Sequence, residues 1–184
     1  MLQPNFTPFP VLTTERLVLR QITAADANEL FFLRSDETVM KYIDKARAQS
    51  VDEALRHLDV VNEALAKNDS ISWAITLKDD PLMLGYIGYW RMSKENYRSE
   101  VGYVLHPAHH CKGIMSEAFA AVIDYGFGVM KLHSMEAVIN PENVASQKLL
   151  EKHHFVREGY FREDYFYDGK FLDSAIYSLI TPLK

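Results

Sequence analysis

The chain of 184 residues is short of cysteine and of long apolar runs, and each shortage excludes a class of protein. Its single cysteine, Cys111, has no partner for an intrachain disulfide, which fits a reducing compartment. No apolar run approaches the roughly 20 residues that cross a bilayer. The N-terminus also lacks a basic region followed by an apolar core. We therefore expect a cytoplasmic location and no membrane partner.

Basic residues are also fewer than acidic ones: the chain has 20 Lys and Arg against 25 Asp and Glu, which gives a net charge of -5. This charge balance does not favour binding to the phosphate backbone of a nucleic acid, so we expect no nucleic-acid partner. The length and the 48% hydrophobic content are ordinary for one globular domain. We expect residues 1–184 to form a single domain, with 1–10, which hold three of the seven prolines, as an extended arm.

The periodicity of apolar residues changes along the chain between helical and strand spacing. Helices are predicted at 24–34, 51–67, 113–130 and 144–153, with a short one near 37–42. Strands are predicted at 17–20, 72–77, 83–92, 98–105 and 134–139, and Asp168-Gly169 predicts a hairpin in the tail. The order βααβββαβαββ predicts an α/β fold with a mixed sheet, no linker and no internal repeat.

The stretch from Glu100 to Ser116 reads as a strand, a loop marked by proline, and a glycine at the start of a helix. The first N–H groups of a helix have no partner inside it and favour phosphate groups. Gly113 allows close approach of a bulky anion, and Lys112 adds a cation. This stretch therefore predicts a cradle for the diphosphate of a cofactor.

The segments EVGYVLHP, KGIMSEA and NPENVASQKLLEKHHF, together with TERLVLR near the N-terminus, resemble the GCN5-related N-acetyltransferase (GNAT) superfamily. Within it they resemble the branch of ribosomal-protein N-terminal alanine acetyltransferases. The resemblance implies an α+β GNAT fold, in which helices flank a twisted, mostly antiparallel sheet with a splay between two central strands. It also implies acetyl-CoA as cosubstrate and direct attack of a primary amine through a tetrahedral intermediate.

The same resemblance assigns residues to the cofactor. Backbone amides of the loop and helix start would hold the diphosphate, a role that falls on His110, Cys111, Lys112, Gly113, Ile114, Met115 and Ser116. The acyl arm would lie along Tyr103, Val104 and Leu105, with Asn140 and Asn143 also in contact, and the N–H of Val104 or Leu105 could stabilise the oxyanion. His110 and Met115 depart from the family pattern, which has Gln or Arg and Gly or Ala there.

Two residues are candidates for proton transfer. Glu100, at the head of the central strand, would act as base or enter a water relay; alternatively it is a solvated charge paired with Arg98. His106 and His133 are weaker alternatives. Many family members carry a tyrosine where this chain has Leu150, so Ser146 becomes the expected proton donor to the departing thiolate.

The pairs of neighbouring His and Cys residues suggest a metal only superficially. Adjacent residues such as His109, His110 and Cys111, or His153 and His154, cannot easily share one tetrahedral site, so we expect no metal. We expect Cys111 to be a solvent-facing loop residue.

The acceptor follows from the resemblance alone. A protein N-terminal α-amine suits the branch, with the 35–60 helices and the 165–170 hairpin as walls of a peptide slot. A small-molecule amine (a polyamine, amino acid or antibiotic) is the alternative acceptor, and a non-catalytic acyl-CoA-binding domain is the alternative class. The sequence leaves monomer and homodimer both open.

Overall fold

The computed structural model describes residues 1–182 and contains one eight-stranded sheet with the strand order β1-β2-β3-β4-β5-β6-β8-β7. The strands are β1 (Leu12–Thr13), β2 (Leu17–Gln21), β3 (Ile71–Leu77), β4 (Asp80–Ser93), β5 (Arg98–Leu105), β6 (Ser134–Ile139), β7 (Val156–Tyr167) and β8 (Lys170–Ile180). The helices are α1 (Ala27–Ser35), α2 (Glu37–Met40), α3 (Val51–Ala66), α4 (Ile114–Gly128) and α5 (Val144–Lys152), with short 3-10 turns at Ala24–Asp26 and Pro107–His109.

The predicted order of elements and the mixed sheet are confirmed, with small shifts of the boundaries. The two-residue strand β1 was not predicted, because two residues carry no periodicity. Strand β4 begins at Asp80, earlier than predicted, since Leu77 and Asp80 pair directly across a tight turn. The first predicted helix begins as a 3-10 turn before α1. No helix within residues 1–182 is long and apolar enough to cross a membrane.

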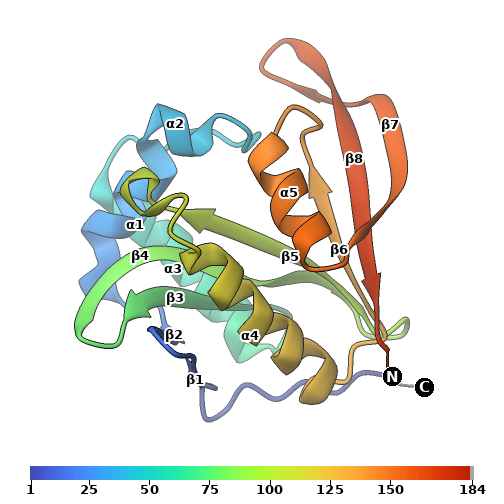
Figure 1. Cartoon of the computed structure of the whole chain (residues 1–184). Coiled ribbons are helices and arrows are strands. Elements are labelled where there is room, and N and C mark those ends of the chain that lie inside the picture. Colours follow the sequence, from blue (N-terminus) through green and yellow to red (C-terminus); the bar gives the residue numbers. More distant parts are fainter. Residues whose placement is uncertain (183–184) are drawn as a thin grey trace.

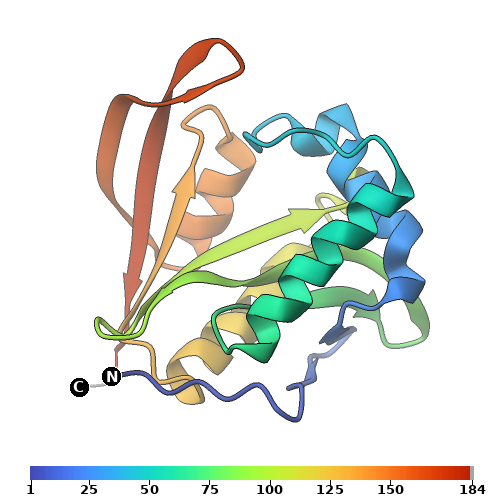
Figure 2. The ribbon, with the colours of Figure 1, turned by 180° about the vertical axis from the view of Figure 1, so that it is seen from behind.

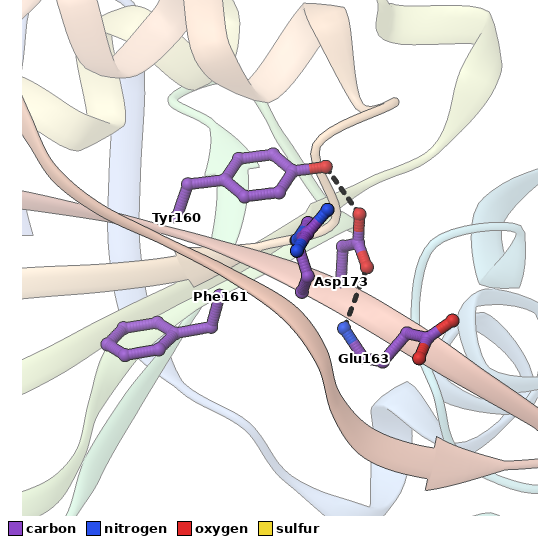
Figure 3. A pocket seen from close by; sticks show the side chains of 5 residues that line it. Tyr160, Phe161, Glu163 and Asp173 are labelled. Carbon is purple, nitrogen blue, oxygen red and sulfur yellow. Dashed lines mark hydrogen bonds between the residues drawn. The ribbon is translucent and has the colours of Figure 1, made fainter.

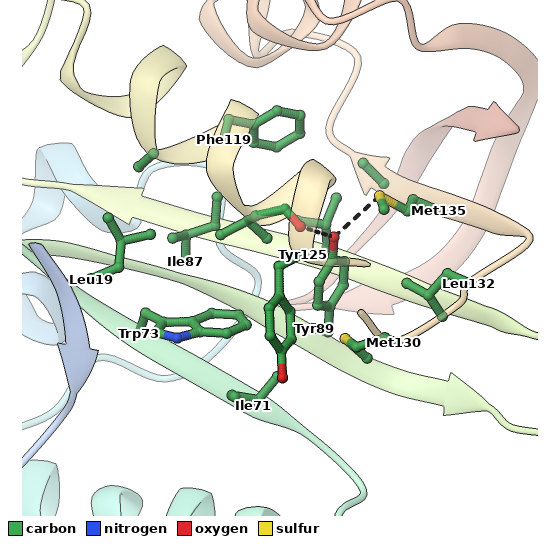
Figure 4. Close-up of a cluster of buried hydrophobic side chains, with 14 of the residues drawn as sticks. Leu19, Ile71, Trp73, Ile87, Tyr89, Phe119, Tyr125, Met130, Leu132 and Met135 are labelled. Atoms are coloured by element: carbon green, nitrogen blue, oxygen red, sulfur yellow. Dashed lines mark hydrogen bonds between the residues drawn. The ribbon is translucent and has the colours of Figure 1, made fainter. Parts of the chain in front are cut away.

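Helices cover both faces of the sheet. Helices α4 and α5 lie on the near face in Figure 1, and α1 and α3 lie on the opposite face, which Figure 2 shows from behind. The larger part of the core lies under α4 (Figure 4), where the ring of Trp73 contacts Tyr89 and Tyr125 edge-on, with centroids 6.4 and 5.3 Å apart. The buried Tyr89 hydroxyl donates to the Val122 carbonyl at 2.7 Å, so the polar end of this side chain is satisfied.

Polar side chains cap the N-termini of two helices, α3 and α5. Ser50 Oγ accepts from the N–H of Glu53 at the start of α3, and the Glu53 carboxylate accepts in turn from the N–H of Gln49. At the start of α5, Asn143 Oδ1 accepts from the N–H of Ser146 at 3.1 Å. These caps fix where each helix begins, and the second fixes the position of Ser146.

The expected splay lies between β5 and β6, the one parallel pair in the described sheet. These strands pair only at Arg98–Ser134, Ser99–Met135 and Glu100–Glu136. Beyond Glu100, β5 stays paired with β4 as far as Leu105, and β6 stays paired with β8 as far as Ile139. The two strands diverge in a V that both views show, with α5 and α2 near its open end (Figures 1 and 2).

Candidate active site

Strand β5 directs alternate side chains to opposite faces of the sheet at the splay. Val104 packs in the cluster under α1 and α3, whereas Tyr103 and Leu105 pack against the core under α4. By the same alternation Glu100 shares the face of Val104. The candidate base and the side chain of Tyr103 therefore reach the splay from opposite sides.

Glu100 is only 4% exposed and lies where β5 and β6 begin to separate. Burial raises its pKa to about 6; Arg91, whose Nη1 lies 3.2 Å from the carboxylate, opposes this rise, and Glu136 adds to it. The alternative of a solvated ion pair with Arg98 is wrong, because Arg98 contacts Glu136 instead. Glu100 is thus mostly ionised at neutral pH and close to the range in which it can accept a proton.

Ser146 is buried and lies beside Tyr103, with the two hydroxyl oxygens 2.6 Å apart. Burial raises the pKa of Tyr103 well above its usual value, so the phenol stays protonated, while the hydrogen bond to Ser146 opposes the rise. The Tyr103 ring also packs edge-on against Phe119 at 5.2 Å. Sequence reasoning gave Tyr103 a backbone role only and missed this hydroxyl. The signal was available in the alternation of side chains along VGYVL, which directs Tyr103 to the face of the sheet that α4 covers.

The backbone of β5 presents alternate N–H groups to the splay. The His106 N–H donates to the Leu84 carbonyl on β4 at 2.8 Å, and Leu105 and Gly85 form the adjacent register pair. Because hydrogen bonding alternates along an antiparallel pair, the N–H of Val104 faces β4. The N–H groups of Tyr103 and Leu105 face the gap. Of the two expected oxyanion donors, Leu105 is the one directed into the splay.

The loop before α4 has the backbone conformation that a phosphate cradle requires. Gly113, the N-cap of α4, has a φ of 75°, and Cys111 has a φ of 59°. The N–H groups of Ile114, Met115 and Ser116 precede the first bond of the helix, from the N–H of Glu117 to the Gly113 carbonyl. These groups fit a diphosphate because they are donors without helical partners beside the positive end of the helix dipole.

The turn between β1 and β2 anchors this loop through contacts that sequence reasoning missed. Arg16 pairs with Glu117 at 2.7 Å and donates through Nη1 to the Lys112 carbonyl at 3.1 Å. A Cβ at Gly113 would lie 3.4 Å from Arg16 Nη2. Thr14 also donates to the Glu117 carboxylate. Nothing in the local sequence links residues about a hundred positions apart, so only the fold brings them together.

The side chains of the predicted cradle have different surroundings. His110, Cys111 and Lys112 are exposed, and the His110 ring contacts the Leu105 carbonyl at 2.9 Å. Ile114 is buried in the core, with Met115 packed against it. Ser116 Oγ lies 2.9 Å from His153 Nε2 on α5. Cys111 is an exposed free thiol, as expected.

Asn140 and Asn143 lie in the turn between β6 and α5, on the β6 side of the splay. Asn140 Oδ1 accepts from the N–H of Glu142 at 2.9 Å, and Asn143 Oδ1 caps α5. The oxygens of both amides are occupied by the turn. The weaker candidates lie elsewhere: the His106 ring stacks on Phe32 and accepts from the N–H of Ala108, and His133 is exposed.

The loop after α2 and the β7–β8 hairpin meet beyond the splay, where the Tyr165 hydroxyl donates to the Asp44 carboxylate. A separate hollow of about 610 Å³ lies on the hairpin itself (Figure 3). Its lining residues are Tyr160, Phe161, Arg162, Glu163 and Asp173. Strands β6 and β8 separate β7 from β5, so this hollow is distinct from the splay.

In the described part of the chain, no three His, Cys, Asp or Glu side chains gather as a metal site requires.

Comparison with known proteins gives a consistent picture. Residues 16–156 match the family profile described as Acetyltransferase (GNAT) domain. The uncharacterized N-acetyltransferase YoaA of Bacillus subtilis is 33% identical over 95% of this chain and 98% of its own. The [Ribosomal protein uS5]-alanine N-acetyltransferase of Escherichia coli is 26% identical over 93% and 91%. The spermidine N(1)-acetyltransferase of Vibrio cholerae is 24% identical over 86% and 89%.

Solved structures share the whole fold. A GNAT-family acetyltransferase from Bacillus anthracis superimposes with a TM-score of 0.82 at 28% identity, over 93% of this chain and 98% of that one. The ribosomal L7/L12 alpha-N-protein acetyltransferase RimL, solved in complex with coenzyme A, reaches a TM-score of 0.85 at 18% identity, over 95% and 100%.

Proposed function

The chain belongs to the GNAT acetyltransferase family and is an acetyl-CoA-dependent N-acetyltransferase, and we propose that its acceptor is a protein N-terminal α-amine. One observation carries the proposal for the site: Glu100 and the Tyr103–Ser146 pair face the same splay from opposite sides of β5. This arrangement separates a proton acceptor from a proton donor by the width of one strand. Acetyl transfer to an amine requires such a separation, because the amine loses a proton while the thiolate gains one.

The proposed binding of acetyl-CoA uses the backbone of two elements. The N–H groups at the start of α4 would hold the diphosphate, and the open edge of β5 would pair with the amide groups of the arm through Tyr103 and Leu105. Gly113 keeps the cradle open, since a side chain there would meet Arg16 and strain the backbone. When bound, acetyl-CoA supplies an acetyl group activated as a thioester.

In the proposed mechanism Glu100 takes the proton of the acceptor amine, directly or through water. An α-amine has a pKa of about 8, so a carboxylate with a pKa near 6 is a weak but adequate base once the amine attacks. The N–H of Leu105 faces the splay and would stabilise the oxyanion of the tetrahedral intermediate.

The departing thiolate would receive its proton from Ser146. Burial keeps the Tyr103 phenol protonated, and in the proposed mechanism its O–H donates to Ser146 Oγ, which directs the serine proton towards the thiolate. A thiolate whose thiol has a pKa of about 8.5 is already a good leaving group, so a weakly acidic hydroxyl is sufficient to assist its departure, and water would return the proton that Ser146 gives up. Tyr103 acts through Ser146 and is therefore a positioning residue.

The choice of a protein N-terminus rests on the acceptor side of the splay. The contact between Tyr165 and Asp44 joins the hairpin to the loop after α2 and gives a wall for an extended peptide. The similarity to the uS5-alanine N-acetyltransferase supports the same acceptor class, and the similarity to the spermidine enzyme supports the small-molecule alternative. We also propose a cytoplasmic location, which the exposed thiol of Cys111 supports.

Mass spectrometry of the acetylated products tests the acceptor class. The enzyme would receive acetyl-CoA and a peptide with a free N-terminal alanine, the same peptide with a blocked N-terminus and one internal lysine, or spermidine. We expect acetylation at the free N-terminus and little at the lysine. Acetylation of spermidine alone would contradict the proposed acceptor and favour a small-molecule amine.

A further inference from the structure

Three cationic side chains from different elements lie on the face of α1 and α3, and two of them, Arg91 and Lys45, act on Glu100. Arg91 follows Trp90 on β4, and its guanidinium carbon lies 4.3 Å from the centre of the Trp90 ring. The Lys45 ammonium, from the loop after α2, lies 4.9 Å from the same ring. Trp90 is the register partner of Glu100. Arg34, near the end of α1, is close enough to lower the pKa of Lys45.

These cations outnumber the carboxylates that could neutralise them. Arg91 pairs with Glu100, but neither Arg34 nor Lys45 forms an ion pair with any residue in 1–182. The buried Nε of Arg34 has no hydrogen-bond partner among these residues. An unpaired guanidinium N–H is costly, and the Tyr86 hydroxyl beside the Arg34 side chain is neutral, so the charge of Arg34 has no counterion within this part of the chain.

The nearby carboxylates are already engaged. Glu136, the register partner of Glu100 on β6, contacts Arg98, and Asp44 accepts from the Tyr165 hydroxyl. The bond from the neutral Tyr165 hydroxyl leaves the negative charge of Asp44 in place. Arg34, Lys45, Arg91 and Arg98 therefore exceed the three carboxylates Glu100, Glu136 and Asp44 by one charge, although the chain as a whole is acidic.

Burial and the nearby cations lower the pKa values of two neighbouring basic groups, His57 and Lys45. Burial, together with the nearby charges of Arg34 and Lys45, lowers the pKa of His57 on α3 to about 4. Desolvation lowers the pKa of Lys45, with contributions from Arg34 and Arg91 that outweigh the opposing effect of Glu100. His57 is thus neutral at pH 7 and adds no charge, which leaves Arg34 and Lys45 as the two cations of this face without an ion pair among residues 1–182.

We propose that the acceptor carries a carboxylate close to its reactive amine, which binds Arg34 and Lys45 while the amine faces Glu100. The inference rests on the proposed function and deepens it by naming the chemistry of the acceptor. An acidic side chain just after the N-terminus of a protein and the α-carboxylate of a free amino acid provide the same group. A polyamine does not, since its second ammonium would meet Arg34 and Lys45.

Paired acceptors that differ only in this group test the proposal. One pair is a peptide with Ala-Glu at its N-terminus against the same peptide with Ala-Gln, and the other is alanine against alaninamide. We expect a carboxylate acceptor to exceed its amide by roughly tenfold in kcat/KM, the effect of one charge-assisted hydrogen bond. A preference in the first pair identifies a peptide side chain as the source, and one in the second pair identifies the α-carboxylate.

Variants locate the preference on the protein. Lys45→Gln, at an exposed position, and Arg34→Gln should bring the ratio towards one, whereas Arg34→Lys should retain part of it. Arg56→Gln, on the exposed side of α3, is the matched control and should leave the ratio unchanged. Equal turnover of carboxylate and amide acceptors overturns the anionic preference. A ratio that survives in both Arg34→Gln and Lys45→Gln overturns the assignment of that preference to these two residues, and neither result touches the proposed acceptor class. An enzyme that acetylates neither pair but acetylates spermidine overturns the proposed acceptor class as well.

Discussion

The hydroxyl oxygens of Tyr103 and Ser146 lie 2.6 Å apart and join strand β5 to helix α5 at the splay. They come from positions 43 residues apart in the chain. The pair places a buried phenol beside the serine that we propose as proton donor.

Tyr103→Phe should lower kcat and leave the dissociation constant of acetyl-CoA unchanged. The substitution removes the hydroxyl but keeps the ring that packs on Phe119. We expect a fall in kcat of roughly fivefold, which corresponds to one hydrogen bond. In a Ser146→Ala background the same change should have little further effect, because the two hydroxyls act as one unit. Steady-state kinetics of the four proteins measure this coupling; additive losses would show that Tyr103 does not act through Ser146.

Glu100→Gln should remove one limb of the pH–rate profile. In the native enzyme, kcat/KM should fall as the pH drops through about 6, where the buried carboxylate becomes protonated. A second limb should follow the acceptor α-amine near pH about 8. The variant should lose the limb near 6, keep the other, and lose roughly a hundredfold in rate. A profile that retains both limbs would mean that the base is another group.

The same substitution should increase stability at neutral pH. The pKa of Glu100 rises from 4.5 to about 6 on folding, so between these values the native state binds more protons than the unfolded state. The free energy of unfolding therefore falls as the pH rises through this window, by up to about 2 kcal/mol. Glutamine does not ionise and avoids this cost.

Chemical denaturation of both proteins below and above this window measures the difference. Relative to the wild type, Glu100→Gln should become more stable as the pH rises from 4.5 to 6, and Glu63→Gln, at an exposed position on α3, should show no such trend. A constant difference between wild type and Glu100→Gln would indicate that the carboxylate is ionised at no cost.

Gly113→Ala should weaken acetyl-CoA binding as well as stability. Gly113 has a φ of 75°, and an L-residue in that region costs about 1–2 kcal/mol. The added Cβ would also meet Arg16, so the N–H groups of the cradle would shift. Gly169→Ala is the matched control, because Gly169 has a φ of 78° with nothing within 4 Å of its Cβ. Calorimetry should show similar destabilisation in both variants but weaker acetyl-CoA binding only in Gly113→Ala.

The strand–loop–helix conformation of the proposed cradle could be predicted from the sequence because its signals are local. A strand, a proline and a glycine before a helix follow one another within Glu100–Ser116, and the backbone of that stretch determines its conformation. The caps of α3 and α5 were predictable for the same reason, since each depends on residues three positions apart.

The electrostatic environment of Glu100 could not be predicted, because it depends on an irregularity in β4. The register of β4 and β5 shifts between Trp90 and Ser93, and Arg91 has a φ of 47°. Such a bulge interrupts the alternation of side chains and redirects one of them. Arg91 therefore lies over Trp90 and reaches Glu100, whereas the neighbour in sequence, Arg98, contacts Glu136.

The release of free coenzyme A thiol, with and without an amine, tests the central claim most directly. The measurement compares wild type and Glu100→Gln in the presence of acetyl-CoA and an N-terminal alanine peptide. The account predicts thiol release by the wild type that depends on the peptide and is strongly reduced in the variant. Binding of acetyl-CoA without thiol release from any amine would contradict it.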